Sequence, residues 1–527
     1  MLGLNLPSPP TLFPVGRGGK GGESLAPERL ALIFGARAWT YAELEAEARA
    51  LAARLAALGV GHGSRVAMLL PNVPQAVFLV HAVGLLGGVL VPLNTRLTSD
   101  ELRFQVRRAA PALLAHNQAT APLAMSLAQD VPLLDLDAKP EAAPNAFKQA
   151  RDGWTPTAHD VHTIVFTSGT TGRPKGALLT WGNHWWSAVA SGWRLGVQPD
   201  DRWLLCLPLY HVGGLAVLLR SALYGTTVIL HERFDPSAVI AALQAHRATV
   251  ISLVPTLLKR LLEAGLDART APALRVALLG GAAAAPDLVA QACAAGIPVA
   301  LTYGLTEAAS QVATAPPQET REFPDSVGLP LQGVSVRIAD EQGTALPPNE
   351  VGEIWVRGPN VMRGYLDDPE ATAAALRGGW LRTGDLGFVD ARGALHVVQR
   401  RVDLIVSGGE NIYPSEVEHV LASYPGVEGV CVVGVPDVEW GQRVVALIQP
   451  APGEQVDSPA VQAFCRQRLA GYKCPRQVLL VESLPLTASG KLDRRAAQTL
   501  ATQLLAQREV DSSLTPAPLS LRERRWG

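Results

Sequence analysis

Apolar and polar positions along the chain alternate between two kinds of segment. Residues 40–60, "TYAELEAEARALAARLAALGV", repeat apolar side chains at helical spacing. Short apolar runs such as "TIVFT" (163–167) and "RVALLG" (275–280) lie between segments of this kind. A regular alternation of helix and strand predicts an α/β fold, in which helices cover mostly parallel sheets.

The pattern changes near residue 351. Turn residues there separate closely spaced strands, as in "GGWLRTGDLGFVDARGALHVVQR" (378–400), which predicts an antiparallel β subdomain over about 325–400. Helix and strand alternate again after residue 400. We therefore expect a large N-terminal domain, residues 24–400, and a small C-terminal α/β domain, residues 401–510. Residues 1–23 and 511–527 lack periodicity and are predicted to be flexible tails.

Composition and charge exclude several classes of protein. The chain has 527 residues, of which 48% are apolar and 18% charged, values typical of a globular protein with at least two domains. Its 46 Lys and Arg against 47 Asp and Glu give a formal net charge of -1. No overall field attracts nucleic acid or an acidic membrane, so we expect neither as a partner. The sequence leaves the oligomeric state open.

The cysteines and the most apolar run bear on location. Five cysteines are scattered without a C-x-x-C pair, which predicts neither a disulfide framework nor a zinc site and favours a reducing cytoplasm. Residues 76–93 have membrane-spanning length, but they contain His81 and the pair Gly87-Gly88. We interpret the run as a buried helix followed by a buried strand. No export signal is recognisable, so a cytoplasmic protein without stable membrane insertion is expected.

A glycine-rich segment, "FTSGTTGRPKG" (166–176), follows one predicted strand and precedes a helix expected from about Thr180. It does not match the G-x-x-x-x-G-K-[ST] phosphate loop, because Arg173 and Pro174 separate Gly172 from Lys175. Its glycines permit close approach of an anion to the backbone, and its hydroxyls and lysine add donors. We predict polyphosphate binding by Thr167, Ser168, Gly169, Thr170, Thr171, Gly172 and Lys175. The alternative is an ordinary surface loop.

Three further segments contain candidate functional side chains. In "LTYGLTEAASQ" (301–311), Tyr303 is suited to stacking on a base and Glu307 to binding Mg²⁺. In "GGWLRTGDLG" (378–387), Asp385 is predicted to lie in a turn and to bind ribose hydroxyls. "LPLTASGKLDR" (484–494) places Lys491 near the end of the folded chain. Taken singly, Glu307 is better explained as a helix N-terminal acid and Asp385 as a turn residue, and Lys491 is an uninformative surface lysine.

The order and spacing of the four segments resemble the AMP-forming adenylating enzymes, which include acyl- and aryl-CoA synthetases, luciferases and peptide-synthetase adenylation domains. The resemblance covers roughly residues 27–499. It implies that a small carboxylic acid reacts with ATP to form an acyl adenylate, which then reacts with a thiol such as that of coenzyme A. It also implies Mg²⁺ as a cofactor.

The resemblance implies roles for individual residues. The loop binds the β and γ phosphates, Glu307 and Thr171 serve Mg²⁺, and Lys491 supplies the cation for adenylation on a mobile C-terminal domain. Further nucleotide-binding positions are implied at Gly280, Gly281, Tyr303, Gly304, Thr306, Asp385 and Arg400. Ser407, Gly408 and Gly409 correspond to the face that presents coenzyme A, although a plain tight turn remains an alternative.

The hinge departs from the family pattern Gly-Arg-x-Asp-Asp. Here the run is Gln399-Arg400-Arg401-Val402-Asp403, so that the glycine is missing and Val402 occupies a position that is normally polar. A β-branched residue restricts backbone rotation, so we expect slower domain rotation or rotation centred on a neighbouring residue.

The acid substrate is indicated by two segments. "LPLYHVGGL" (207–215) places His211 where the family has a gate to the acyl pocket. "EAASQVAT" (307–314) is similar to the o-succinylbenzoate CoA ligases of menaquinone synthesis. That resemblance implies a substrate with a second carboxylate, and therefore a polar anchor within an apolar pocket. Candidates are Ser310, Gln311 and Arg220, the last equally interpretable as a structural helix residue.

Three alternative functions remain open. One is a CoA ligase for a fatty acid or another aryl acid. The second is a standalone adenylation enzyme that loads a carrier protein. The third is a nucleotide sensor without turnover, which the presence of both Lys491 and Glu307 disfavours.

Overall fold

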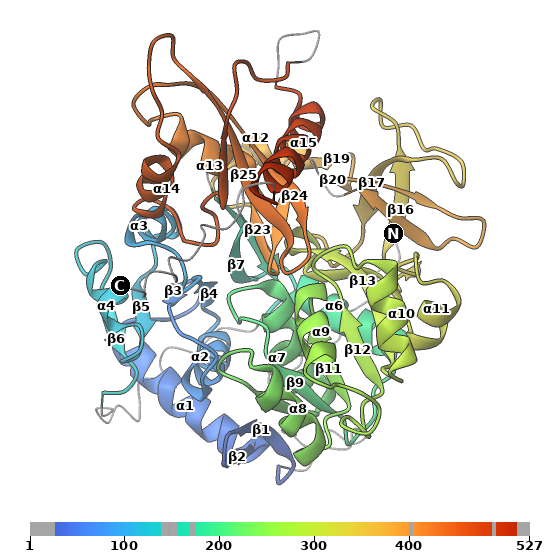
Figure 1. The fold of residues 1–527 in the computed structure, drawn as a ribbon. Coiled ribbons are helices and arrows are strands. Elements are labelled where there is room, and N and C mark those ends of the chain that lie inside the picture. The colour runs from blue at the N-terminus through green and yellow to red at the C-terminus, as the bar shows by residue number, and fades with distance from the viewer. Residues whose placement is uncertain are drawn as a thin grey trace, which may run out of the picture. The chain divides into compact units, whose positions relative to one another are not determined.

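The computed structural model describes residues 27–138, 147, 156–167, 174–399, 404–486 and 492–513, with the side chains of 399 and 509–513 excepted. The chain divides into two compact units, and the boundary between them lies at Arg401 and Val402 (Figure 1). The first unit contains three sheets and the second a small α/β fold.

A nine-stranded sheet is the first sheet of the first unit. Its order is β15-β14-β13-β12-β11-β9-β10-β1-β2. The strands are β1 (Leu30–Phe34), β2 (Arg37–Thr40), β9 (Arg202–Leu205), β10 (Thr227–Leu230), β11 (Val250–Leu253), β12 (Val276–Leu279), β13 (Val299–Leu305), β14 (Ser310–Ala315) and β15 (Leu329–Pro330). From β1 to β13 the neighbours pair in parallel. Such strands are buried on both faces, which explains their continuous apolar sequences.

Helices connect these parallel strands and lie against the sheet (Figure 1). They are α7 (Val212–Tyr224), α8 (Pro236–Ala245), α9 (Pro255–Glu263), α10 (Pro286–Ala294) and, after β14, α11 (Pro317–Glu322). Parallel neighbours need such crossovers because a tight turn cannot join them. The observed architecture confirms the predicted α/β class.

A seven-stranded sheet, ordered β18-β8-β7-β4-β3-β5-β6, is the second sheet of the first unit. Its strands are β3 (Arg65–Met68), β4 (Val89–Pro92), β5 (Leu113–His116), β6 (Leu133–Asp135), β7 (Val161–Thr167), β8 (Lys175–Thr180) and β18 (Gly364–Tyr365). The associated helices are α1 (Tyr41–Ala57), α2 (Pro74–Leu85), α3 (Ser99–Ala109), α4 (Ala121–Met125) and α6 (Trp181–Leu195). The long apolar run is α2 followed by β4, as predicted.

The helix expected from about Thr180 is α6, and a capping box fixes its start. Asn183 N donates to Thr180 Oγ1, and the backbone N–H of Thr180 donates to Asn183 Oδ1. Two N-terminal donors are thereby satisfied. Because β8 ends at Thr180, the cap also fixes where the strand turns into the helix.

The third sheet is the antiparallel β subdomain. It consists of β16 (Ser335–Ala339), β17 (Gly352–Arg357), β19 (Leu376–Arg377), β20 (Trp380–Val389) and β21 (Leu395–Gln399), with α12 (Pro369–Ala375) beside it. All of its pairings are antiparallel. Its inward face carries Ile354 and Val356, which are buried in a core shared with β14.

The second unit contains two small sheets. The strands are β22 (Ile405–Ser407), β23 (Glu410–Ile412), β24 (Val427–Asp437), β25 (Gly441–Pro450) and β26 (Gln477–Leu480), and the helices are α13 (Pro414–Leu421), α14 (Ser458–Arg466) and α15 (Arg494–Ser513). Helix α15 extends to Ser513, so the prediction of a tail from residue 511 is wrong there. Its apolar positions Ala497, Ala501 and Leu505 pack on β24 and β25, which anchors the helix.

Membrane-spanning helices and disulfides are the two features that bear on the expectations from the sequence. Among the described residues, no helix combines the length and apolarity that a bilayer crossing requires. The five cysteines are free thiols, and four of them are buried.

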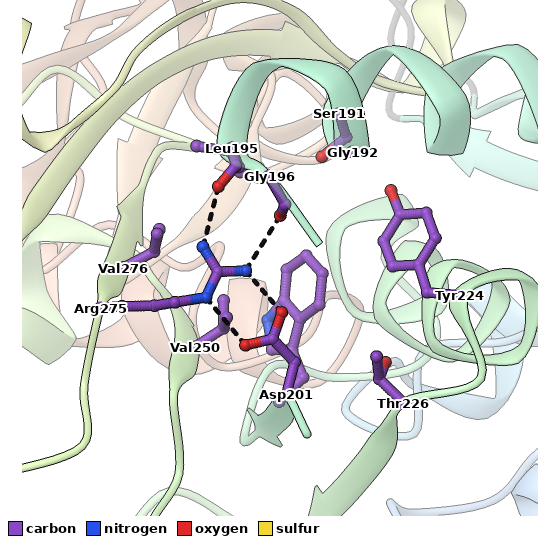
Figure 2. A pocket seen from close by; sticks show the side chains of 11 residues that line it. Ser191, Gly192, Leu195, Gly196, Asp201, Tyr224, Thr226, Val250, Arg275 and Val276 are labelled. Atoms are coloured by element: carbon purple, nitrogen blue, oxygen red, sulfur yellow. Dashed lines mark hydrogen bonds and ion pairs between the residues drawn. The ribbon is translucent and has the colours of Figure 1, made fainter. Parts of the chain in front are cut away.

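An ion pair joins three elements at one end of the nine-stranded sheet (Figure 2). The guanidinium of Arg275 donates to both carboxylate oxygens of Asp201, at 2.8 and 2.6 Å. It also donates to the carbonyls of Leu195 and Gly196, at 2.8 and 2.9 Å, where α6 ends. A cavity of about 10 Å³ lies beside the pair, with room for about one water molecule.

Hydrogen bonds stabilise the ionised form of Asp201. Burial raises the pKa of this carboxyl, but hydrogen bonds from Arg275, the Gln198 backbone and Thr249 outweigh burial and hold the pKa below its usual range. Arg275 therefore satisfies the end of a helix and a buried carboxylate at once.

Removing this guanidinium should destabilise the first unit. We expect Arg275→Leu to lower the free energy of unfolding by about 3 kcal/mol, because a buried carboxylate and two carbonyls lose their donor. Arg269→Leu is the control: Arg269 also binds a carboxylate, that of Asp267, but its side chain is 91% exposed. Its loss should change stability by less than about 0.5 kcal/mol in urea titrations. Equal losses would contradict this assignment.

Three buried histidines surround the start of β7. The ring of His162 stacks on Trp181 at 3.7 Å between centroids and lies 5.3 Å from the His184 ring. His184 Nε2 lies 2.9 Å from Thr163 Oγ1. Burial lowers the pKa of His81 to about 4, and burial together with Arg220 lowers the pKa of His184 to about 3. Burial, followed by His184 and His81, also lowers the pKa of His162.

These shifts predict acid lability. Unfolded histidines bind protons below about pH 6.5, whereas the buried rings stay neutral, so the stability present above pH 6.5 is lost as pH falls. At pH 5 the loss is about 2 kcal/mol for each histidine. Urea titrations of the His81→Gln variant should show a loss between pH 7 and pH 5 that is smaller by about this amount. An identical loss in variant and parent would refute the contribution of His81.

Candidate functional site

The hairpin between β13 and β14 determines the geometry of the site. After β13 the chain forms a short 3-10 helix, η1 (Thr306–Ala308), and then turns back through Ala309 and Ser310, whose φ angles are 49° and 100°. A Cβ atom at Gly304 would lie 1.8 Å from the Ser310 carbonyl oxygen, so this position requires glycine. Ser187 Oγ donates to the Ala309 carbonyl at 2.6 Å and braces the turn from α6.

Glu307 lies in η1, and one of its two carboxylate oxygens accepts a hydrogen bond from another side chain. Its Oε1 accepts a hydrogen bond from the Tyr365 hydroxyl at 2.9 Å, and its backbone carbonyl accepts one from Met362 N at 2.8 Å. The described residues offer no hydrogen bond to its other oxygen. Magnesium commonly uses one or two carboxylates together with substrate phosphates and water. Glu307 fits that pattern, and the described residues contain no cluster of three His, Cys, Asp or Glu that would bind a metal alone.

Two of the phosphate-loop candidates are described: Thr167 ends β7 and Lys175 begins β8. Thr167 and Lys175 pair across these antiparallel strands, and the Lys175 ammonium lies 5.5 Å from the centroid of the Tyr365 ring. Several predicted site residues lie outside the described part of the chain and stay predictions: Ser168, Gly169, Thr170, Thr171, Gly172, Arg400 and Lys491. The same holds for Val402 at the hinge.

Asp385 and Tyr303 form a buried pair. The Tyr303 hydroxyl donates to Asp385 Oδ2 at 2.7 Å, and the two residues are 1% and 2% exposed. The prediction that Asp385 lies in a turn is wrong, because it belongs to β20. Residues 383–385 oppose Ile354 alone, which is a bulge with Gly384 at φ +75°. A bulge redirects side chains within a strand and supplies the glycine that had indicated a turn.

The sequence did not reveal the hydroxyl of Tyr303 as a partner of Asp385, since residues 82 positions apart give no local signal. Stacking of a base on Tyr303 stays a prediction. The glycines at the end of β12 are close to β13: a Cβ at Gly280 would lie 2.6 Å from Thr302 Cγ2, and Gly281 has φ +80°. The nucleotide contact that the family resemblance implies for these two glycines stays a prediction, as does that of Thr306.

His211 and Arg220 are both positioned by α7. His211 is the residue before its first turn, half-buried, with its ring 4.8 Å from that of Tyr210. Arg220 is 2% exposed and donates through Nη2 to Ser187 Oγ at 3.2 Å, while its Nε has no partner in the described part of the chain. Burial lowers the pKa of Arg220, and Tyr224 acts in the opposite direction.

The Gln311 side chain hydrogen-bonds within the hairpin of β13 and β14. It is 2% exposed, and its amide nitrogen donates to the hydroxyls of Thr314 and Thr302 at 2.8 and 3.3 Å. No amide hydrogen remains for a substrate carboxylate, so the structure does not support the prediction that Gln311 is the anchor. Ser310 is half-buried in the strained turn and keeps that candidacy together with Arg220.

In the second unit, Ser407 to Gly409 form the tight turn between β22 and β23. Both central residues, Gly408 and Gly409, have positive φ, at 60° and 86°, as a two-residue hairpin of type I′ requires. A Cβ at Gly408 would lie 2.8 Å from Trp440, and the Arg476 guanidinium stacks 4.5 Å from the Trp440 ring. Trp440 and Arg476 were missed, because no local pattern links them to the glycines.

Two family models and a named ligase match this chain. Residues 24–366 match the family model described as AMP-binding enzyme, and residues 416–491 match the AMP-binding enzyme C-terminal domain. A 2-succinylbenzoate–CoA ligase from Geobacillus kaustophilus is 43% identical over 476 residues, which cover 90% of this chain and 96% of that protein.

This chain is similar in structure to the o-succinylbenzoate CoA synthetase from Bacillus subtilis, as seen in three solved complexes of that enzyme. A double mutant bound with the product analogue OSB-NCoA gives a TM-score of 0.83 at 40% identity, covering 89% of this chain and 95% of the other. The complex with the acyl-adenylate intermediate OSB-AMP gives 0.67 at 40% identity, with the same coverage. The complex with ATP and magnesium ion gives 0.67 at 39% identity, covering 89% and 97%.

Proposed function

Because the chain belongs to the AMP-binding enzyme family, we propose that it is an ATP-dependent, AMP-forming ligase that joins 2-succinylbenzoate to coenzyme A. Identity of 43% across 90% of the chain to a ligase of that name supports the substrate. The observation that carries the chemistry is the convergence of a carboxylate, Glu307, and an ammonium, Lys175, on Tyr365. The product would serve menaquinone biosynthesis.

The reaction has two steps. A carboxylate oxygen of the acid attacks the α-phosphorus of ATP, the bond to the β-phosphate oxygen breaks, and pyrophosphate leaves. The thiolate of coenzyme A then attacks the acyl carbonyl carbon, and AMP leaves with the bonding electrons. We assign Thr167 to Lys175 to the departing pyrophosphate, and Lys491 to the charge that develops at the α-phosphate. Bound Mg²⁺, held by Glu307 and Thr171, would neutralise phosphate charge.

We assign the second carboxylate of the acid to the region of Arg220 and Ser310. A buried guanidinium is costly unless an anion compensates it, and no described acidic side chain pairs with Arg220. Its hydrogen bond to Ser187, which in turn binds the Ala309 carbonyl, connects it to the turn that carries Ser310. His211, at the start of the same helix, would line the entrance for the acid.

In the second unit we assign Gly408, Gly409, Trp440 and Arg476 to coenzyme A. The two glycines adopt the positive φ angles that the turn requires, and Trp440 packs against Gly408 and supports the turn. An indole with a stacked guanidinium offers a flat face and a charge suited to a nucleotide. The free thiols of the five cysteines support a reducing cytoplasm as the location.

A panel of acids tests the substrate. With purified protein, MgATP and coenzyme A, we expect kcat/KM for 2-succinylbenzoate to exceed that for benzoate or hexanoate by roughly a hundredfold, because a buried polar anchor rejects acids without the second carboxylate. AMP release and the thioester product are measured together. Higher efficiency with hexanoate or benzoate contradicts the assigned acid. Acyl-AMP without any thioester would favour a standalone adenylation enzyme.

A pair of variants tests the division of labour between the half-reactions. Lys491→Ala should lose adenylation yet convert supplied acyl-AMP to the thioester, because its cation acts only at the α-phosphate. Trp440→Ala should retain adenylation and raise KM for coenzyme A by roughly tenfold, because the turn at Gly408 loses its support. Each half-reaction is assayed separately. Equal loss of both half-reactions in either variant would contradict the assigned roles.

A further inference from the structure

Tyr365 contacts two groups of opposite charge from distant parts of the sequence. Its hydroxyl donates to Glu307 Oε1 at 2.9 Å, and its ring centroid lies 5.5 Å from Lys175 Nζ. Glu307 belongs to η1, Lys175 begins β8, and Tyr365 ends β18. One side chain therefore contacts both a carboxylate, that of Glu307, and an ammonium, that of Lys175.

The backbone of Tyr365 is itself firmly held. Strand β18 pairs with β8, with Tyr365 opposite Ala177 and Gly364 opposite Leu178. Tyr365 N donates to Thr372 Oγ1 at 2.9 Å. A Cβ at Gly364 would lie 2.8 Å from Thr372 Cγ2, so that close packing against α12 leaves the strand little freedom. The hydroxyl and the ring are thus presented from a fixed position.

Glu307 and Lys175 make no ion pair with each other in the described structure, although they share this neighbour. A direct pair would neutralise the carboxylate needed for a cation and the ammonium needed for phosphate. The hydroxyl of Tyr365 instead occupies one carboxylate oxygen and leaves the other available. Its ring attracts the ammonium through the negative face of the π system.

We propose that Tyr365 is a positioning residue that keeps Glu307 and Lys175 apart and oriented, so that the first can bind magnesium and the second the phosphates of the same nucleotide. The inference rests on the proposed function and adds a residue to it. Groups that hydrogen-bond to a metal ligand fix its orientation and affect affinity by about tenfold or more. A purely structural tyrosine would affect stability and leave the magnesium dependence unchanged.

Calorimetric binding of ATP, measured without acid or coenzyme A over a range of Mg²⁺ concentrations, tests the proposal. Tyr365→Phe keeps the ring and removes the hydroxyl, so the Mg²⁺ concentration for half-maximal ATP binding should rise by about tenfold. Tyr365→Leu removes both contacts, and ATP binding should remain weakened even at saturating Mg²⁺. KM for the acid should change by less than about twofold in Tyr365→Phe, since we assign the hydroxyl to Glu307 and not to the acid.

Tyr41→Phe is the matched control. The Tyr41 hydroxyl is buried and donates to the carbonyls of Ser221 and Thr226 at 2.8 and 2.7 Å, so its loss lowers the melting temperature and leaves the Mg²⁺ dependence unchanged. An unchanged Mg²⁺ dependence in Tyr365→Phe, or an equal shift in Tyr41→Phe, overturns the proposal. Because neither acid nor coenzyme A is present, MgATP binding that behaves as expected in a protein inactive on 2-succinylbenzoate would overturn only the proposed substrate.

Discussion

The site in the first unit depends on the close approach of the Gly304 backbone to the carbonyl of Ser310. No side chain fits there, and the two residues at the turn adopt positive φ angles that cost free energy outside glycine. The turn persists because its surroundings hold it: Ser187 binds the Ala309 carbonyl, and Asn360 binds the carbonyls of Ala308 and Gln311. Glu307, Tyr303 and Ser310 obtain their positions from this one hairpin.

Arg275, which is half-buried, and Arg220, which is buried, differ in how their charge is compensated. Arg275 meets a carboxylate and two helix-terminal carbonyls, so its charge is compensated within the protein. Arg220 is more deeply buried and makes one hydrogen bond to a neutral hydroxyl. A compensated buried cation contributes to the fold, whereas an uncompensated one suits an anion that comes from outside.

The sequence alone predicted most helices and strands, because these depend on local patterns of residues. The helices, the parallel strands and the start of α6 near Thr180 follow from periodicity, and the family resemblance follows from motif order and spacing. It could not place Asp385, because a bulge depends on how many residues the partner strand supplies. Nor could it identify Tyr365 or Trp440, whose partners lie far away in the chain, or exclude Gln311, whose amide is consumed by two threonines. Such contacts exist only once the sheets are assembled.

The two-residue strand β18 has a consequence for biosynthesis. Lys175 leaves the ribosome first, Glu307 more than a hundred residues later, and Tyr365 later still. The strand then has to add to the edge of β8, which was made long before. A nascent chain that ends before residue 365 therefore lacks the side chain that separates the two charges. Nucleotide can stabilise this geometry only after the seven-stranded sheet is complete, so that ligand binding during synthesis would report on finished folding of this sheet.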